Sequence, residues 1–282
     1  MASGDQDHLT VRDFARVAGF IHSYSGIKIP EAKKTMVESR LRKRVAATGA
    51  ADLADYCRLV FDRGGLAVES VHLIDAITTN KTEFFREPDH FRFLVDVALP
   101  ELARRRRAGP GTIIKAWSTA SSIGAEPYTM AMVLADASAR LGGFRIAILA
   151  TDISTLVLAT AVMGIYPAAM AAPVPPDMRR RYLLQSKDAS RCRVRVSAEL
   201  RRMVQFGRLN LMDAAYPVDR DMDLVFCRNM LIYFDKPTQH AILARLCSHL
   251  RPGGYLFLGH AESTAGCGLP LQQIGPSTFM RD

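Results

Sequence analysis

Apolar residues recur at helical spacing through the first eighty or so residues of the 282-residue chain. Thr10 is the expected N-cap of a first helix, whose spaced apolar residues are Val11, Phe14, Ala18 and Ile21. A second helix is expected to begin near Pro30 and to bury Val37, Leu41 and Val45. Two more amphipathic segments are Leu53–Phe61 and Leu66–Ile77. The pattern predicts a small all-helical N-terminal domain over residues 1–77.

Beyond residue 109 the pattern alternates between strands and helices, after a helix predicted over residues 90–106. Apolar runs typical of strands occur at residues 113–117, 144–150, 204–206, 224–227 and 255–258. Helical runs lie between most of them, at residues 127–140, 155–163 and 237–250. This alternation predicts an α/β fold with a doubly wound, mostly parallel sheet. We therefore expect a second domain over residues 90–282, joined to the first by a linker at residues 78–89.

The interval between residues 173 and 203 departs from this alternation. Its segment Arg193-Val194-Arg195-Val196 alternates basic and apolar residues, as in a strand with one buried face. We predict a small β insertion at residues 174–203, within the sheet domain.

Hydropathy, cysteine content and net charge limit the classes of function that this chain can have. No apolar run approaches the roughly 18 residues that span a bilayer, and the first five residues lack a signal-peptide pattern. We therefore expect a cytoplasmic protein without membrane insertion. The five cysteines are scattered without a C-x-x-C pair, which predicts reduced thiols and no metal site. The formal charge of +9 favours an acidic partner, which is nucleic acid, anionic lipid or an acidic protein surface.

The loop after the first predicted strand, residues 117–128, contains one glycine, Gly124, among mostly small residues. A dinucleotide site needs several glycines for close approach to phosphates, and a P-loop needs Gly-Lys-Ser/Thr, which is absent. The loop therefore favours a nucleoside ligand without phosphates. Asp152 ends the second predicted strand, where such folds hold ribose hydroxyls. The alternative is that Asp152 caps the next helix, although Ser154 is better placed for that role.

Four ordered segments resemble the signatures of the CheR family of chemotaxis-receptor methyltransferases. They read TTNKTEFFRE at residues 78–87, WSTASSIGAEPY at 117–128, FCRNMLIYFD at 226–235 and LRPGGYLFLGHAES at 250–263. The resemblance is specific because these motifs are long and correctly ordered, and it is strongest from about residue 73 onward. It implies a Rossmann-like methyltransferase sheet, with S-adenosylmethionine as cofactor and S-adenosylhomocysteine as product.

The resemblance also implies a set of cofactor-binding residues from the linker and the strand ends, namely Asn80, Thr82, Arg86, Glu126, Asp152, Asn210, Leu211, Arg228 and Asn229. In this set Asp152 accepts hydrogen bonds from ribose hydroxyls, Glu126 pairs with the methionyl ammonium and Arg86 holds the methionyl carboxylate. The alternatives are surface ion pairs for Arg86 and Arg228 and a helix cap for Asn80.

In the family the methyl acceptor is a glutamate on the glutamate-rich cytoplasmic helices of a chemoreceptor. A glutamate carboxylate is already ionised at neutral pH, so the reaction requires no general base and catalysis consists of positioning. Arg86 and Tyr233 are the predicted catalytic residues that orient this carboxylate, the alternative for Tyr233 being a core aromatic. His260 and Glu262 are expected to shape their loop without a chemical role.

The second predicted helix carries a basic flank that consists of Lys33, Arg40, Lys43 and Arg44. This flank is predicted either to dock the helical domain onto an acidic receptor helix or to be a solvated face. Some family members capture a receptor peptide with a glycine-containing loop in the insertion. Residues 185–192 contain no glycine, which argues against such capture here.

Two features of the sequence would suit other functions. This chain has Ile123 and Ala125 where the family pattern has threonine and glutamate, which would suit a cofactor-binding signalling scaffold with weak or no catalysis. Several retained family residues argue against that alternative, namely Arg86, Asp152, Asn229 and Tyr233. A nucleic-acid methyltransferase would fit the positive charge, but the Asn/Asp-Pro-Pro-aromatic run of such enzymes is missing after the fourth strand. We therefore expect no nucleic-acid partner.

Overall fold

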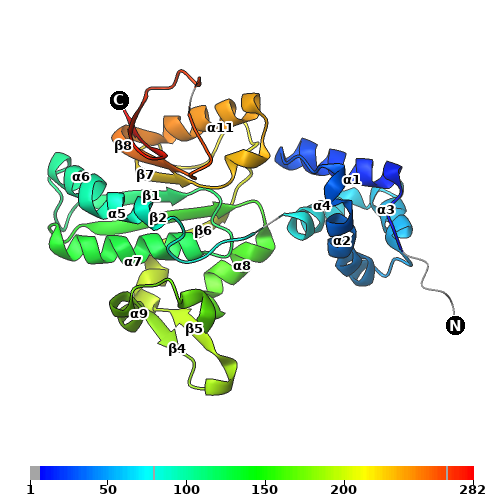
Figure 1. Ribbon diagram of the computed structural model, residues 1–282, viewed down its shortest axis with the longest axis horizontal. Coiled ribbons are helices and arrows are strands. Elements are labelled where there is room, and N and C mark those ends of the chain that lie inside the picture. Colours follow the sequence, from blue (N-terminus) through cyan, green and yellow to red (C-terminus); the bar gives the residue numbers. More distant parts are fainter. Residues whose placement is uncertain (1–6, 79, 265) are drawn as a thin grey trace. The chain divides into compact units, whose positions relative to one another are not determined.

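The computed structural model of the chain describes residues 7–78, 80–264 and 266–282. They form two compact units, residues 7–78 with Ile153–Thr155 and residues 80–152 with 156–282 (Figure 1). Residues 1–6 of the predicted helical domain and Thr79 of the predicted linker lie outside the described residues. Among the residues described, no helix is both long and apolar enough to cross a bilayer.

The N-terminal unit packs helices around one apolar core. They are α1 (Val11–Ser25), α2 (Lys34–Thr48), α3 (Leu53–Phe61) and α4 (Leu66–Ile77), with a 3-10 turn η1 (Glu31–Lys33) before α2. Thr10 caps α1 as predicted, by accepting a hydrogen bond from the backbone N–H of Asp13. The buried face of α1 centres on Phe14 and Ile21, and Val11, about a quarter turn away, is 71% exposed. The predicted helix is therefore confirmed, with Val11 outside its buried face.

A partly buried ion pair between Arg44 and Glu69 joins two of these helices, and Tyr56 bonds a third to it. Arg44 donates to Glu69 from Nε at 3.0 Å and from Nη2 at 2.7 Å. The Tyr56 hydroxyl donates to the same carboxylate at 3.0 Å. Although burial opposes it, the hydrogen bonds from Arg44 and Tyr56 lower the pKa of Glu69. The two-point contact therefore holds α2 against α4, with α3 bonded to the same charge.

In the described part of the second unit, seven strands form one sheet in the order β6-β2-β1-β7-β8-β10-β9. They are β1 (Ile113–Ser118), β2 (Arg145–Asp152), β6 (Val204–Arg208), β7 (Met222–Cys227), β8 (Leu250–Leu258), β9 (Leu271–Gly275) and β10 (Thr278–Arg281). Strands β6, β2, β1, β7 and β8 run parallel, and β10 is antiparallel to both β8 and β9. The predicted doubly wound, mostly parallel sheet is confirmed.

Helices connect the parallel strands close to where the sequence predicts them, as α7 (Ala125–Arg140), α8 (Thr155–Met163) and α11 (Lys236–His249). The predicted helix at 90–106 is a continuous helical stretch in three parts, α5 (Pro88–Phe93), a π-helical turn η2 (Leu94–Ala98) and α6 (Leu99–Arg105). Pro100 has no backbone N–H for an i−4 carbonyl, which accounts for the wider turn just before it. Helix α11 ends at His249 and β8 follows directly, and the pairing of β8 with β7 shifts register between Leu250 and Tyr255, so residues 251–254 lie at an irregularity of the strand.

A second, antiparallel sheet has the order β3-β5-β4. Its strands are β3 (Ile165–Pro167), β4 (Leu183–Gln185) and β5 (Arg193–Val196), and the neighbouring helices are α9 (Pro176–Tyr182) and α10 (Ala198–Met203), with 3-10 turns η3 (Ala168–Ala171) and η4 (Ala189–Arg191). This sheet begins before the predicted insertion at residues 174–203, because three-residue β3 is too short to show an alternating pattern. Strands β9 and β10 are also missed, since short runs that include polar residues do not resemble the buried parallel strands.

We expect Arg44→Ala to lower the free energy of unfolding by about 2–4 kcal/mol, because it leaves the Glu69 carboxylate buried without its cation. Urea denaturation followed by circular dichroism measures this difference. The control is Lys43→Ala, on the exposed side of the same helix, which should change the free energy by no more than about 0.5 kcal/mol. Equal stability of the two variants would contradict the structural role of the ion pair.

Candidate functional site

The loops that carry the predicted cofactor residues meet where β1, β2 and β7 end. Ser118, the last residue of β1, pairs with Ala150 of β2 and Phe226 of β7. The three strands therefore end at one edge of the sheet, where open α/β folds bind their ligands. The backbone N–H of Ser121 donates to the Thr151 carbonyl at 2.9 Å and holds the β1 loop across this edge.

The β1 loop turns into α7 at Gly124, which has a φ of 92°. A Cβ atom there would lie 2.9 Å from both the Ala161 Cβ and the Tyr166 hydroxyl, so the turn requires glycine. Ile123 packs partly buried against the core, and its carbonyl accepts a hydrogen bond from Tyr166 at 2.7 Å. Ala125 is fully buried in the first turn of α7. Ile123 and Ala125, which depart from the family pattern, therefore pack against the protein core.

Asp152 closes β2 and is 7% exposed. Its Oδ2 accepts from the backbone N–H of Ser122 at 2.8 Å, and its carbonyl accepts from the N–H of Leu209 at 3.0 Å. The Ser122 hydroxyl donates to the Asn80 carbonyl at 3.1 Å, which brings the predicted linker against the same loop. The carboxylate is thus held at the sheet edge, in the position where the sequence analysis expects a ribose-binding group.

Arg228, directly after β7, carries a buried charge, because its side chain is 2% exposed. Its Nε and Nη2 donate to Glu87 Oε2 at 3.2 and 3.1 Å, and its Nη1 donates to Glu126 Oε2 at 3.0 Å. Nη2 also donates to the Arg86 carbonyl, and the Ser118 hydroxyl donates to Glu126 Oε1 at 2.7 Å. The alternative of a surface ion pair is therefore wrong for Arg228. Its guanidinium joins the linker, the start of α7 and the β7 loop.

Asn229 adopts a left-handed backbone with a φ of 57° and donates from Nδ2 to Glu87 Oε1 at 3.0 Å. Although burial opposes it, this bond and the charge of Arg228 lower the pKa of Glu87, so the carboxylate is ionised at neutral pH. Glu87 is not predicted from the sequence, because its partner Arg228 follows 141 residues later. Its place directly after the arginine of the FFRE segment is the one available signal.

Glu262 organises the backbone of the β7 loop. Its carboxylate accepts from the N–H groups of Asn229 at 2.9 Å, Leu231 at 2.6 Å and Gly259 at 2.6 Å. Burial raises the pKa of Glu262, and these N–H groups partly offset that effect. The side chain therefore ties the end of β8 to the loop that carries the predicted cofactor residues, in agreement with its expected loop-shaping role.

Arg86, Thr82 and Tyr233 are all half-buried. Arg86 donates from Nη1 to the Lys81 carbonyl at 3.0 Å, and Thr82 lies inside the turn that this bond closes. Tyr233 ends the 3-10 turn η5 (Leu231–Tyr233). The joint role of Arg86 and Tyr233 in orienting a substrate stays a prediction.

Asn210 and Leu211 follow β6, which pairs with β2 at the edge of the sheet. Asn210 Oδ1 accepts from the N–H of Met212 at 3.0 Å and forms an Asx turn. Leu211 is 5% exposed, and its carbonyl accepts from the Tyr216 hydroxyl at 2.8 Å. Local hydrogen bonds therefore shape this loop, with Leu211 buried and Asn210 half-buried beyond the end of β6.

The predicted docking flank divides into two kinds of residue. Arg44 is bound to Glu69, and Arg40 donates to the carbonyls of Ile77 and Thr78 at the end of α4. Lys33 and Lys43 are exposed. The arginines therefore stabilise the helical unit, and docking stays a prediction that concerns the two lysines.

Comparisons with known proteins identify both units. The family described as "CheR methyltransferase, SAM binding domain" matches residues 80–276, and the family described as "CheR methyltransferase, all-alpha domain" matches residues 12–78. The chain is 36% identical over 279 residues to Chemotaxis protein methyltransferase 2 of Pseudomonas aeruginosa, covering 98% of this chain and 95% of that protein. It is 40% identical over 250 residues to the Chemotaxis protein methyltransferase of Klebsiella aerogenes, covering 89% and 82%.

We expect Glu262→Gln to lower the free energy of unfolding by roughly 1–3 kcal/mol. Only one oxygen of the glutamine side chain can accept, so N–H groups that now bond to Oε2, those of Asn229 and Gly259, lose their acceptor. Urea denaturation of the variant measures the loss, with the exposed Glu83→Gln as control. An unchanged stability would mean that water can replace the carboxylate.

Proposed function

The chain belongs to the CheR methyltransferase family, and we propose that it methylates glutamate side chains of a chemoreceptor-type protein, giving glutamate methyl esters and S-adenosylhomocysteine. It is an S-adenosylmethionine-dependent methyltransferase, since the SAM-binding family matches residues 80–276. The names of its relatives, chemotaxis protein methyltransferases, support a chemoreceptor as substrate. That substrate would place the reaction in the cytoplasm, on the glutamate-rich helices of the receptor.

One observation carries the proposal: Glu126, Asp152 and the Arg228–Asn229 pair converge at the carboxyl end of the parallel strands. The residues fit S-adenosylmethionine, because the tight Gly124 turn lacks a phosphate-binding glycine pattern and Asp152 provides an acceptor for hydroxyls. When bound, the cofactor supplies a methyl group on a positively charged sulfur.

The proposed roles divide among the predicted cofactor residues. Asp152 accepts from the ribose hydroxyls, Glu126 pairs with the methionyl ammonium, and Arg86 holds the methionyl carboxylate. Arg228 acts through its partners, since its bond of 3.0 Å fixes the Glu126 carboxylate in place. The remaining members line the site: Asn80, Thr82, Asn210, Leu211 and Asn229.

The chain's part in the reaction is positioning and exclusion of water. An acceptor glutamate with a pKa near 4.3 is ionised at neutral pH, so no side chain must remove a proton. Arg86 and Tyr233 would hold that carboxylate in line with the methyl group, and such alignment can supply roughly 7–11 kcal/mol of barrier reduction. A dry site also keeps the weak nucleophile unsolvated.

The scaffold alternative loses support from the positions of Ile123 and Ala125. Both side chains pack in the wall of the loop, and Glu126 beside them keeps its bonds to Arg228 and Ser118. The missing family carboxylate therefore leaves this polar network intact. We favour an active enzyme on that ground.

We expect purified protein to bind S-adenosylmethionine and S-adenosylhomocysteine in isothermal titration, and Asp152→Ala to weaken both by roughly 10- to 150-fold, the cost of losing hydrogen bonds to a charged group. The matched control is Asp177→Ala, an exposed carboxylate on α9, which should leave both affinities unchanged. Folded wild-type protein that binds neither ligand would sink the enzyme proposal.

We expect the double variant Lys33→Glu and Lys43→Glu to lower kcat/KM for receptor methylation about tenfold at low salt while kcat changes little, because surface charges act on encounter. Initial rates with receptor in membranes measure this, and Arg104→Glu with Arg107→Glu gives the same charge change on exposed residues of the other unit. If both double variants behave like wild type, the basic flank is a solvated face.

A further inference from the structure

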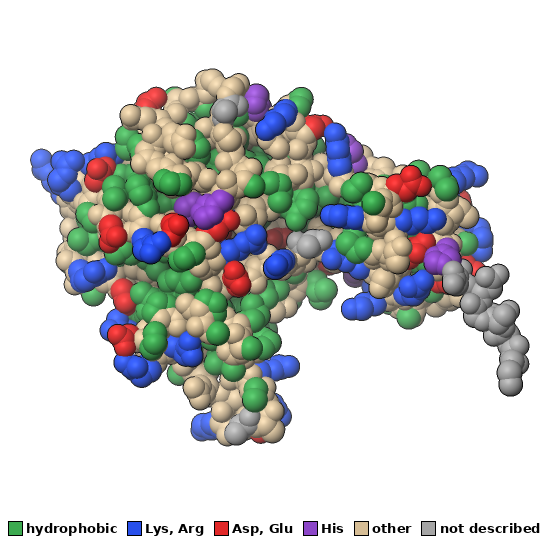
Figure 2. Space-filling view, in the orientation of Figure 1, with side chains coloured by type: hydrophobic (Ala, Val, Ile, Leu, Met, Phe, Trp, Pro, Cys, Tyr) green, Lys and Arg blue, Asp and Glu red, His purple; other side chains and the backbone are tan. Residues whose placement is uncertain are grey.

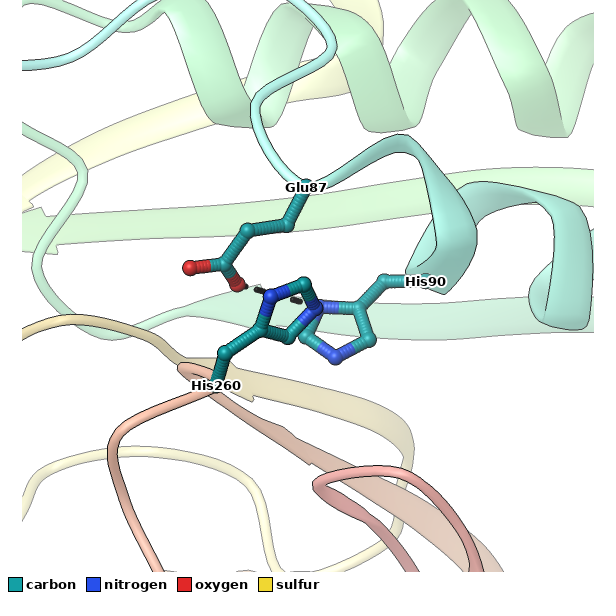
Figure 3. A group of neighbouring side chains, drawn as sticks. All are labelled: Glu87, His90 and His260. Atoms are coloured by element: carbon teal, nitrogen blue, oxygen red, sulfur yellow. Dashed lines mark ion pairs between the residues drawn. The ribbon is translucent and has the colours of Figure 1, made fainter.

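Three side chains with metal-ligating atoms converge beside the Arg228 network (Figure 3). Glu87 precedes α5, His90 lies within α5, and His260 follows β8. One donor atom from each lies within 4.8 Å of the others. All three belong to the α/β unit, and Figure 2 shows histidine at the surface of this unit among acidic and basic side chains.

His90 is the member that most needs an explanation. It is 2% exposed, and within the described residues neither ring nitrogen meets the geometry of a full hydrogen bond, although the Pro276 backbone interacts with the ring. Buried polar atoms are normally well paired, so an imidazole with such weak pairing is unusual. Its Nδ1 lies 3.4 Å from Glu87 Oε2. The His90 and His260 rings pack edge to face, with their centroids 5.1 Å apart. The imidazole is therefore aimed into the cluster.

The donor set suits a particular class of ion. Two imidazole nitrogens and one carboxylate oxygen are ligands typical of zinc and neighbouring divalent metals, and they disfavour magnesium and calcium, which prefer oxygen. Ligand bonds of about 2.0–2.1 Å in a tetrahedron separate donor atoms by roughly 3.3 Å. The His90 to Glu87 distance of 3.4 Å already matches this separation. His260 is exposed, so its side chain can rotate to close the remaining distance.

We propose that Glu87, His90 and His260 bind one zinc-class divalent cation, with a fourth position open to water. The surroundings provide the outer contacts of such a site. Arg228 donates to Glu87 Oε2 at 3.1 and 3.2 Å and Asn229 donates to Oε1 at 3.0 Å, which fixes the plane of the carboxylate. The positive charge of Arg228 is shared with Glu126, so it does not stand uncompensated beside the ion.

The site is not visible as a sequence motif, because Glu87 and His90 lie far in the sequence from His260. No metal site is predicted from the sequence, because its cysteines lack a C-x-x-C pair. The proposal goes beyond methyl transfer and does not depend on it. Its test therefore uses no cofactor and no receptor.

The experiment titrates the full, tag-free chain with zinc chloride by calorimetry and with cobalt chloride by visible absorbance. A Cys192→Ser, Cys267→Ser background removes the thiols that are not buried, which would compete for these metals. We expect one equivalent of either metal to bind, with cobalt giving the absorbance of a four-coordinate site. Absence of binding by the folded protein would overturn the proposal.

Histidine variants locate the site. His260→Ala removes an exposed ligand and should weaken binding at least about tenfold, while His22→Ala, an exposed histidine of the helical unit, should leave it unchanged. His90→Phe keeps an aromatic ring in the packing and should also abolish binding, with circular dichroism confirming the fold. Equal affinity for wild type and His260→Ala, or equal weakening by His22→Ala, would refute the site.

Discussion

The buried charge of Arg228 is the constraint on which the site depends. A guanidinium taken out of water is tolerated only when carboxylates and carbonyls replace its hydration. Here these acceptors come from Glu87, Glu126 and the Arg86 carbonyl. Because they belong to the linker and to the start of α7, satisfying one charge fixes three segments against the edge of the sheet. The arrangement of the predicted cofactor residues follows from that requirement.

Backbone geometry supplies the second constraint. Gly124 turns the β1 loop where any side chain would collide with Ala161 and Tyr166. Glu262 fixes the conformation of the β7 loop. Its carboxylate accepts hydrogen bonds from backbone N–H groups that would otherwise be unpaired around the left-handed Asn229. A tight turn and a buried acceptor thus shape the two loops between which the proposed cofactor lies.

Ion pairs inside the protein also limit what the net positive charge can indicate about a partner. A count of +9 indicates an acidic partner, but several of these cations are bonded within the protein. Arg44 holds Glu69 and Arg228 holds Glu87 and Glu126. A charge that neutralises a buried carboxylate contributes to the fold and is not available to steer a partner. Exposed residues such as Lys33 and Lys43 are therefore the ones to consider for recognition.

The sequence by itself determines the fold class and the family. Helical spacing predicts α3 and α4, alternation predicts the parallel strands, and long ordered motifs identify the family, because these signals are local in the chain. Tertiary structure alone decides which polar residues meet. Glu87 and Arg228, or His90 and His260, are neighbours only after the parallel strands align their ends. Short β3, β9 and β10 also depend on it, because each is stabilised by pairing with a partner strand rather than by its own pattern.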